Sequence, residues 1–314
     1  GKTMEKFVII SDSSMDISKE TRLEYGIEYP VCGKIIFSDG RVEDSDAEWD
    51  KYTPEQYFNE ELKKGIKTSL PNQYEIVSKL EPYFQNGQDI LAIVLSTGIS
   101  GTYSAFVTAG QELMEKYPDR KILVVDSLRY SSGVGLLCLY ASELRAQGKS
   151  IQETYDWVNN ARLSVHQCGV LDDLHFLARN GKITGFKAFM GTMVGVKPIA
   201  DFSNQTGQPF PLGNVRGYKK AYKLIGQYIQ ATIGDASDKI IVVESSLRDE
   251  QATELERIVK EQIKPRKVIR TRCGMTNGSA IGPGLATVFY VGEKELTENL
   301  QEESKIFKDI VATL

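Results

Sequence analysis

Hydrophobic residues in the first half of the chain form short, nearly continuous runs, each followed by a polar turn and an amphipathic stretch. The runs at 89–96 (DILAIVLS) and 121–127 (KILVVDS) have no polar face, whereas 100–118 and 131–148 repeat apolar positions at helical spacing. Strands that are apolar on both faces and alternate with helices are typical of a parallel sheet covered on both sides. We therefore expect an α/β fold with a parallel sheet flanked by helices in this half.

Four further segments complete the first half. Residues 6–14 (KFVIISDSS) predict a strand that ends in Asp and Ser, and residues 27–37 predict a second extended segment. Residues 53–65 predict a helix, because Thr followed by Pro suits the N-cap and first helical position and a glycine closes the segment. Residues 68–87 (TSLPNQYEIVSKLEPYFQNG) predict another helix with its own polar start.

The second half of the chain has a different pattern, with longer helices, a hairpin and fewer strands. We expect helices at 150–165, 218–234 and 251–263, shorter helical pieces at 171–181 and 184–195, strands at 239–245 and 266–273, and a Gly- and Pro-punctuated hairpin at 196–217. This half therefore predicts a second α/β domain with a mixed or antiparallel sheet. We place the boundary near residues 160–170, which gives domains at 1–165 and 166–314.

Composition and charge exclude several classes of protein. Hydrophobic residues make up 41% of the 314 residues and charged residues 25%, which is typical of a globular protein. The net charge of −4 argues against a nucleic-acid binder, which needs a concentrated basic face. The four cysteines are far apart and include no CxxC pair, so we expect a reduced, cytoplasmic protein without a zinc site. No apolar stretch approaches the ~20 residues of a membrane span, so we expect no stable membrane insertion.

Three polar turns follow predicted strands: SDSS at 11–14, STGISGT at 96–102 and DSLRYSSG at 126–133. The carboxyl ends of parallel strands meet at one edge of a sheet, and ligands bind there in open α/β sheets. We therefore expect these three turns to gather at one edge and to form the main candidate site.

The turn at 96–102 admits more than one interpretation. Its hydroxyls could simply cap the following helix, as Ser and Thr commonly do. Alternatively, backbone N–H groups and the helix dipole attract an anion, to which Ser100, Thr102 and Thr68 donate. The turn contains no Lys or Arg, which favours a carboxylate over a polyphosphate.

A catalytic interpretation of the same turn also stays open. The sequence GISGT resembles a nucleophile elbow around Ser100, but Thr102 stands where the second outer glycine belongs. The chain has only two histidines, His166 and His175, to serve a Ser-His-Asp triad in a hydrolase or acyltransferase. The sequence contains no P-loop, and no group of potential metal ligands has suitable spacing.

A soft apolar stretch at 186–196 is the candidate for holding a flexible hydrocarbon chain. Met190 and Met193 lie there with two phenylalanines, two valines and two glycines. Methionine adapts to irregular ligands, although the same spacing also suits an ordinary core helix.

Eight stretches together resemble the DegV family, in family order over nearly the whole chain. They are SDSSMDIS, KTSLPNQYEI, STGISGTYSA, VVDSLRYSSGVG, LHFLARNGKITG, GVKPIADFSNQTG, NVRGYKKA and GPGL. The resemblance implies a bacterial, non-catalytic protein that binds a long-chain fatty acid between its two domains and needs no cofactor. It further implies that the acyl chain is presented to a separate fatty acid kinase subunit, which makes acyl phosphate for phospholipid synthesis.

The resemblance also assigns site residues. Thr68 and Ser100 are expected to hydrogen-bond the carboxylate, Gly101 and Thr102 to supply the helix start beneath it, and Arg216 to contact the kinase subunit. Further expected ligand contacts are Ser69, Ser132, Met190, Met193, Ala280 and Gly282.

The sequence departs from the family pattern at two site positions. The family usually has His-x-Gly-Pro-Gly near the C-terminus, and here Ala280 occupies the place of that histidine. The head-group site therefore loses one donor, or Ser279 or Asn277 supplies it. Lys182 stands for the arginine of the family's Gly-Arg-Ile pattern. These changes leave open a lipid carrier with no kinase partner. The acidic segment 38–52 and the C-terminal helix expected at 298–311 are also additions to the family pattern.

Overall fold

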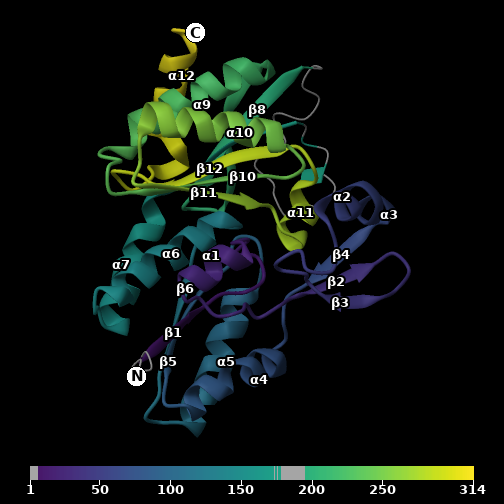
Figure 1. The fold of residues 1–314 in the computed structure, drawn as a ribbon, viewed down its shortest axis with the longest axis vertical. Helices are drawn as coiled ribbons and strands as arrows, with labels where there is room; N and C mark the ends of the chain where they lie inside the picture. The colour runs from purple at the N-terminus through teal and green to yellow at the C-terminus, as the bar shows by residue number, and fades with distance from the viewer. Residues whose placement is uncertain (1–5, 173, 175, 178–194) are drawn as a thin grey trace.

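The computed structural model describes residues 6–172, 174, 176–177 and 195–314. Figure 1 shows two halves stacked along the long axis, with a parallel sheet in the lower half and a larger mixed sheet in the upper half. A small antiparallel sheet lies to one side. The α/β class predicted from the sequence is confirmed, including the difference between the two sheets.

The lower sheet has three parallel strands in the order β1-β5-β6. Its strands are β1 (Phe7–Ile10), β5 (Asp89–Val94) and β6 (Ile122–Asp126). Its helices are α4 (Gln73–Gln85) and α5 (Thr102–Lys116) on one face, and α6 (Ser132–Ala146) and α7 (Ile151–Ala161) on the other. The short α1 (Lys19–Glu24) follows β1. Because β5 is buried along nearly its whole length, it needs apolar residues on both faces, as the sequence indicated.

The small antiparallel sheet has the order β3-β2-β4. Its elements are β2 (Lys34–Phe37), β3 (Val42–Asp44), β4 (Ile66–Ser69), and a helical segment made of α2 (Pro54–Gln56), the π-helical η1 (Tyr57–Glu61) and α3 (Leu62–Lys64). The single helix predicted at 68–87 is wrong at its start, because Thr68 and Ser69 end β4. Pro71 disfavours a helical conformation at the preceding residue, and Asn72 then caps α4 by accepting from Glu75 N–H at 2.8 Å.

Within the described residues, the upper sheet has six strands in the order β11-β10-β12-β7-β8-β9, and only β10 and β11 pair in parallel. The strands are β7 (Val165–Leu171), β8 (Val196–Ser203), β9 (Gln208–Arg216), β10 (Ile240–Ser245), β11 (Lys267–Arg272) and β12 (Leu285–Val291). The helical elements are η2 (Arg162–Ser164), α9 (Gly217–Ile233), α10 (Asp249–Ile258), η4 (Val259–Ile263), α11 (Met275–Ile281), η5 (Glu298–Leu300) and α12 (Gln301–Val311). The predicted hairpin and C-terminal helix are confirmed as β8–β9 and α12.

Two central strands, β7 and β12, were not predicted. They pair with each other in the middle of the upper sheet, and β7 is buried at all seven positions. A central strand covered on both faces has no hydrophobic–polar alternation, so its sequence resembles a buried helix segment of the same length. The start of β7 at Val165 therefore fell inside the segment expected to be helical.

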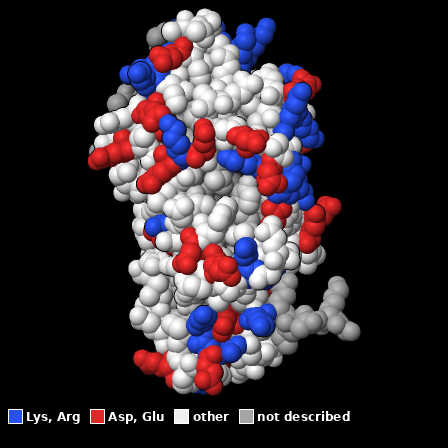
Figure 2. All heavy atoms as spheres, turned by 90° about the vertical axis from the view of Figure 1, so that its left-hand side faces the viewer, with Lys and Arg blue, Asp and Glu red and all other residues white. Residues whose placement is uncertain are grey.

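Helix α6 packs between the two large sheets and joins their cores. Apolar side chains of α6 such as Leu137 belong to one buried cluster with Ile9 of β1 and Val242 of β10. On the face shown in Figure 2, acidic and basic side chains are interspersed, so that face has no continuous basic surface. The four cysteines are buried and form no disulfide. Among the helices of the described residues, none is both long and apolar enough to cross a bilayer.

Candidate functional site

A cavity of about 630 Å³ lies at the carboxyl ends of the parallel strands, bounded by β4 and α11. Its lining residues are Asp12, Ser13, Gly33, Ile66, Lys67, Thr68, Ser69, Leu70, Pro71, Leu95, Ile99, Ser100, Gly101, Thr102, Tyr130, Thr276, Asn277, Ser279, Ala280 and Ile281. The turns after β1, β5 and β6 all contribute, which confirms that the three polar turns gather at one edge. The volume is within the range of small-molecule sites, which is about 300–1,000 Å³.

Six of the predicted site residues line this cavity. They are Thr68, Ser69, Ser100, Gly101, Thr102 and Ala280. Asn277 and Ser279 of α11, which the sequence offered as replacement donors, also line it. Sequence reasoning named Ser13 only as part of the turn at 11–14 and did not single out Thr276 of α11. The turn at 11–14 carried the signal for Ser13, whereas α11 comes from a distant part of the chain that showed no strand–turn–helix pattern.

The remaining predicted residues lie elsewhere. Ser132 is buried at the start of α6, where its hydroxyl donates to Glu244 Oε1 at 2.6 Å. Gly282 directly follows α11 with φ near 75° and lies outside the cavity lining. Arg216 is exposed at the end of β9. Met190 and Met193, like Lys182, lie outside the described residues.

The turn after β5 is held against the upper half of the molecule. Ser96 Oγ donates to the carbonyl of Gly207 at 2.7 Å, and Gln208 Nε2 donates to the carbonyl of Gly98 at 2.8 Å. Gly98 is required here, because a Cβ at this position would lie 1.9 Å from the carbonyl oxygen of Thr206. The β8–β9 hairpin therefore fixes the position of the turn that starts α5.

The hydroxyls of Ser100 and Thr102 lie side by side where α5 begins. Their oxygens are 2.8 Å apart, and the N–H of Thr102 donates to Ser100 Oγ at 3.2 Å. Since only one of the two hydroxyls can donate to the other, one hydroxyl proton is left for an acceptor in the cavity. This pair can bind an anion next to the N-terminus of a 15-residue helix.

Asp12 is the buried acid of the cavity lining. Its oxygens accept from the N–H groups of Leu95 and Ser14, each at 2.8 Å. Burial raises the pKa of Asp12, and the hydrogen bonds from Ser14 and Leu95 oppose that rise. Asp12 therefore fixes the loop after β1 against the end of β5 and contributes its carboxyl group to the cavity lining.

Asn277 of α11 also contributes an acceptor. Its amide nitrogen donates to the carbonyl of Ser14 and to Asp16 Oδ2, both at 2.8 Å. An amide NH₂ group has two hydrogens, so both are engaged and only the amide oxygen is available to the cavity. The donor that a histidine would supply at position 280 is therefore not replaced by Asn277.

The deep side of the cavity is apolar and reaches the upper sheet. Leu95, Tyr130 and Ile281 line the cavity and belong to a buried cluster with Phe202 and Leu285. The rings of Tyr130 and Phe202 are stacked with centroids 5.4 Å apart. Polar groups on one side and this apolar cluster on the other suit an amphipathic ligand.

Charge in the lining is sparse. Asp12 and Lys67 are its only charged residues among those described, and Lys67 is exposed at the edge formed by β4. Apart from the buried Asp12, the polar lining is therefore built from neutral groups with one cation at the rim, which suits a singly charged head group better than a polyphosphate.

No described histidine lines the cavity. His166 is buried in β7, where its Nδ1 lies 2.6 Å from Asp201 Oδ2 and its ring stacks on Tyr290. His175, the other candidate base, lies outside the described residues. The described contacts of Ser100 therefore include no general base, and nothing in them favours a nucleophilic role.

Comparisons with known proteins agree on one family. The family model described as "Uncharacterised protein, DegV family" matches residues 6–293. A DegV domain-containing protein of Clostridium perfringens is 32% identical over 292 residues, covering 92% of this chain and 99% of that protein. A DegV family protein from Thermus thermophilus, described for its fatty acid binding, has a TM-score of 0.81 at 23% identity and covers 91% of this chain and 99% of its own. The Fatty Acid Kinase B3 protein of Streptococcus pneumoniae, solved loaded with linoleic acid, has a TM-score of 0.77 at 19% identity with the same coverage.

Proposed function

The chain belongs to the DegV family, and from that premise we propose that it binds one long-chain fatty acid in the cavity described above. The carboxylate lies against Ser100, Thr102 and Thr68, and the hydrocarbon chain runs toward the apolar cluster between the two large sheets. The observation that carries this proposal is the two-sided lining of one cavity of about 630 Å³. The protein acts as a non-catalytic binding protein of the bacterial cytoplasm.

The energetics suit such a ligand. A C16 chain has ~14 methylenes, and burying them at ~0.8 kcal/mol each supplies roughly 11 kcal/mol. Ordering the chain and losing its free motion offset several kcal/mol of this gain. An unpaired buried carboxylate would be costly, so the hydroxyls determine which end of the ligand lies at the turn before α5. Lys67 lies at the same rim and adds a favourable charge.

Mass spectrometry of an organic extract tests this function directly. We expect protein purified from a bacterial host to carry fatty acid in near-stoichiometric amount. Ala280→Phe places a ring in the cavity and should empty it, whereas Ala312→Phe, at an exposed position after α12, should leave the ligand in place. An empty wild-type extract together with no uptake of added palmitate or oleate would contradict the proposal.

We further propose that the bound carboxylate is presented to a separate ATP-using kinase subunit for phospholipid synthesis, with Arg216 as a contact. The support is the fold shared with the Fatty Acid Kinase B3 protein and the exposure of Arg216 at the end of β9. Pull-down of an ATP-binding partner that makes acyl phosphate from the loaded protein tests this step.

A second candidate is a fatty-acid carrier that has no kinase partner. Ala280 favours it, because a methyl group lines the cavity where the family usually has a histidine at the carboxylate. In that case the loaded protein is recovered without a kinase, and added kinase subunit makes no acyl phosphate from it.

A further inference from the structure

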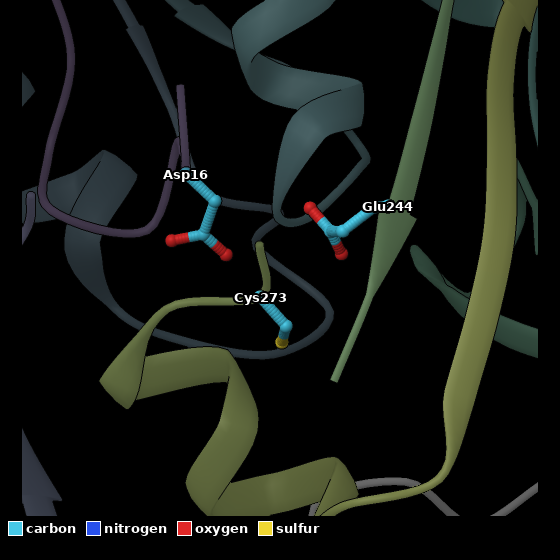
Figure 3. A group of neighbouring side chains, drawn as sticks. All are labelled: Asp16, Glu244 and Cys273. Atoms are coloured by element: carbon cyan, nitrogen blue, oxygen red, sulfur yellow. The ribbon is translucent and has the colours of Figure 1, made fainter. Parts of the chain in front are cut away.

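A second polar cluster lies behind α11, outside the cavity. Figure 3 shows its side chains, Asp16 from the loop after β1, Glu244 from β10 and Cys273 directly after β11. Glu244 is fully buried, and Asp16 and Cys273 are only 5% and 1% exposed. Two acids from different halves of the molecule therefore meet in the interior.

Ser131 bridges the two acids. Its Oγ lies 2.6 Å from Asp16 Oδ2 and 2.6 Å from Glu244 Oε1. A hydroxyl has one hydrogen and can donate to only one of these oxygens, so the other contact needs a proton on the carboxyl group. Glu244 Oε2 is buried and has no hydrogen-bond partner among the described residues, which disfavours full ionisation as well.

No described cation is paired with either acid. Lys19, Arg270 and Arg272 line a pocket that also includes Asp16, together with Glu48. Each of these charged groups has a partner elsewhere. The pairs are Lys19–Asp50 at 2.7 Å, Arg270–Glu256 at 2.9 Å, Arg272–Asp249 at 3.7 Å and Arg22–Glu48 at 3.0 Å. The negative charge of the two acids is therefore not balanced by a described side chain.

The electrostatics agree with this geometry. Burial and the neighbouring charge of Glu244 raise the pKa of Asp16 to about 8, and burial raises the pKa of Glu244. The other titratable groups that face the pair are Cys273 and Tyr130, and burial raises the pKa of both, so they stay neutral near pH 8. The two acids are therefore the groups that titrate here.

The cluster is connected to the cavity through one side chain. Asn277 lines the cavity and donates to Asp16 Oδ2, and its neighbours Thr276, Ser279 and Ala280 on α11 also line it. Gly274, directly before α11, leaves no room for a side chain, because a Cβ there would lie 2.1 Å from Asp16 Oδ1. The position of α11 at the cavity therefore depends on Asp16.

We propose that Asp16 and Glu244 share one proton through Ser131 and that this protonated pair positions Asn277 and α11 for ligand binding. The shared proton does not depend on the proposed fatty-acid function, and only its effect on ligand binding rests on that function. When the pair loses its proton, two adjacent buried charges repel, and the loop after β1 separates from β10. Affinity then depends on the protonated fraction, because a ligand that needs one of two states binds in proportion to the population of that state.

Infrared spectroscopy tests the shared proton without any ligand. We expect the wild type to show the carbonyl stretch of a protonated carboxyl group that titrates near pH 8. Isotope-labelled aspartate and glutamate assign the band, which Asp16→Asn and Glu244→Gln should each remove. Glu303→Gln is the matched control, because Glu303 is a buried acid held by Thr297 in another part of the fold. An unchanged spectrum in both variants would overturn the shared proton.

The pH dependence of fatty-acid affinity tests the positioning role. For the wild type we expect Kd to rise about tenfold per pH unit above pH 8. Glu244→Gln keeps the shape of the side chain without its charge, so no second charge can form beside Asp16 and the rise of Kd above pH 8 should disappear. A wild-type Kd that stays constant to pH 10, or a rise that persists in Glu244→Gln, would overturn the positioning role.

Saturable Zn²⁺ binding that Glu244→Gln abolishes would assign the charge balance to a metal ion and overturn the shared proton. Failure to bind fatty acid at any pH would contradict the proposed function and leave the infrared result intact.

Discussion

Ser100 Oγ and Thr102 Oγ1 lie 2.8 Å apart at the first turn of α5 and line the same cavity. The N–H of Thr102 already donates to Ser100 Oγ, so the oxygen of Ser100 is partly satisfied, and one of the two hydroxyl protons of the pair stays available. The pair combines with the positive end of the helix dipole, so a carboxylate at this place receives both a hydrogen bond and a favourable field.

Ser100→Ala is expected to weaken binding of a fatty acid more than binding of the matching fatty alcohol. A hydrogen bond to a charged group contributes about 1.5 to 3 kcal/mol, so Kd for the acid should rise roughly 10- to 150-fold. A neutral hydrogen bond contributes about 0.5 to 1.5 kcal/mol, so the alcohol should lose roughly 2- to 12-fold. Calorimetric titration of both ligands at pH 7 measures the difference.

Ser104→Ala is the matched control for this experiment. Ser104 lies in the first turn of α5, four residues after Ser100, but it is exposed and does not line the cavity. Its replacement should leave both affinities unchanged. Equal losses for acid and alcohol in Ser100→Ala would remove the head-group role of Ser100.

Gly98→Ala is expected to destabilise the protein and displace the turn before α5. The added Cβ would lie 1.9 Å from the carbonyl oxygen of Thr206, so the turn and the β8–β9 hairpin have to separate. Overpacking of this kind costs about 1 to 3 kcal/mol in the free energy of unfolding. The urea midpoint, measured at constant m-value, reports the loss.

Gly101→Ala provides the comparison within the same turn. At Gly101 the nearest atom to an added Cβ is Leu70 Cδ2 at 3.5 Å, which is an ordinary contact, and φ is −78°. Its effect on unfolding should stay within about 0.5 kcal/mol. If both variants unfold at the wild-type urea concentration, the hairpin does not hold the turn.

The buried acid pair predicts that stability falls with rising pH between about 4 and 8. In that window the unfolded chain has released the proton of Asp16, whose ordinary pKa is about 3.9, while the folded protein retains it up to a pKa of about 8. The folded state then binds one more proton, so the free energy of unfolding falls by about 1.4 kcal/mol per pH unit and levels off above pH 8. Denaturant titrations at several pH values measure this slope.

Glu244→Gln is the comparison variant for the slope of stability against pH. Removing the neighbouring charge lets Asp16 ionise at lower pH, so the difference in slope between wild type and variant isolates the pair from other titrating groups. Parallel pH profiles for the two proteins would show that the pair does not retain a proton in the folded state.

The sequence predicted the edge of the lower sheet well because its signals are local. An apolar strand, a turn of hydroxyls and glycines and an amphipathic helix follow one another directly, and the resemblance to the DegV family placed Thr68 and Ala280 opposite them. Thr68 and Ala280 both line the cavity, together with Ser100, Gly101 and Thr102 of the turn.

What the sequence did not predict depends on contacts between distant segments. The central strands β7 and β12 have no polar face, so neither shows the alternation of a half-buried strand. Ser132 belongs to a matching stretch, but its hydroxyl is engaged by Glu244, 112 residues away in the chain. The engaged amide of Asn277 likewise depends on Asp16, 261 residues away. Such pairings have no signature in a local pattern.

Tyr130 separates the cavity from a smaller void deeper in the molecule. It lines both spaces, and its ring stacks on Phe202 with a centroid distance of 5.4 Å. The smaller void measures about 20 Å³ and has mainly apolar neighbours such as Leu171 and Leu285. In the proposed binding mode, this ring stands where a long acyl chain would have to continue.

Tyr130→Leu is therefore expected to shift the chain-length preference toward longer fatty acids. Each further buried methylene contributes about 0.8 kcal/mol, so the affinity of a C20 acid relative to a C18 acid should rise roughly fourfold per methylene admitted. The loss of the ring should also lower the free energy of unfolding by about 0.5 to 3 kcal/mol.

Tyr140→Leu separates the effect on chain-length preference from the effect on stability, because Tyr140 packs on Trp157 with ring centroids 5.2 Å apart and lies outside the cavity lining. It should lose comparable stability with no change in chain-length preference. A Tyr130→Leu protein with the wild-type ranking of chain lengths would mean that the acyl chain does not reach this ring.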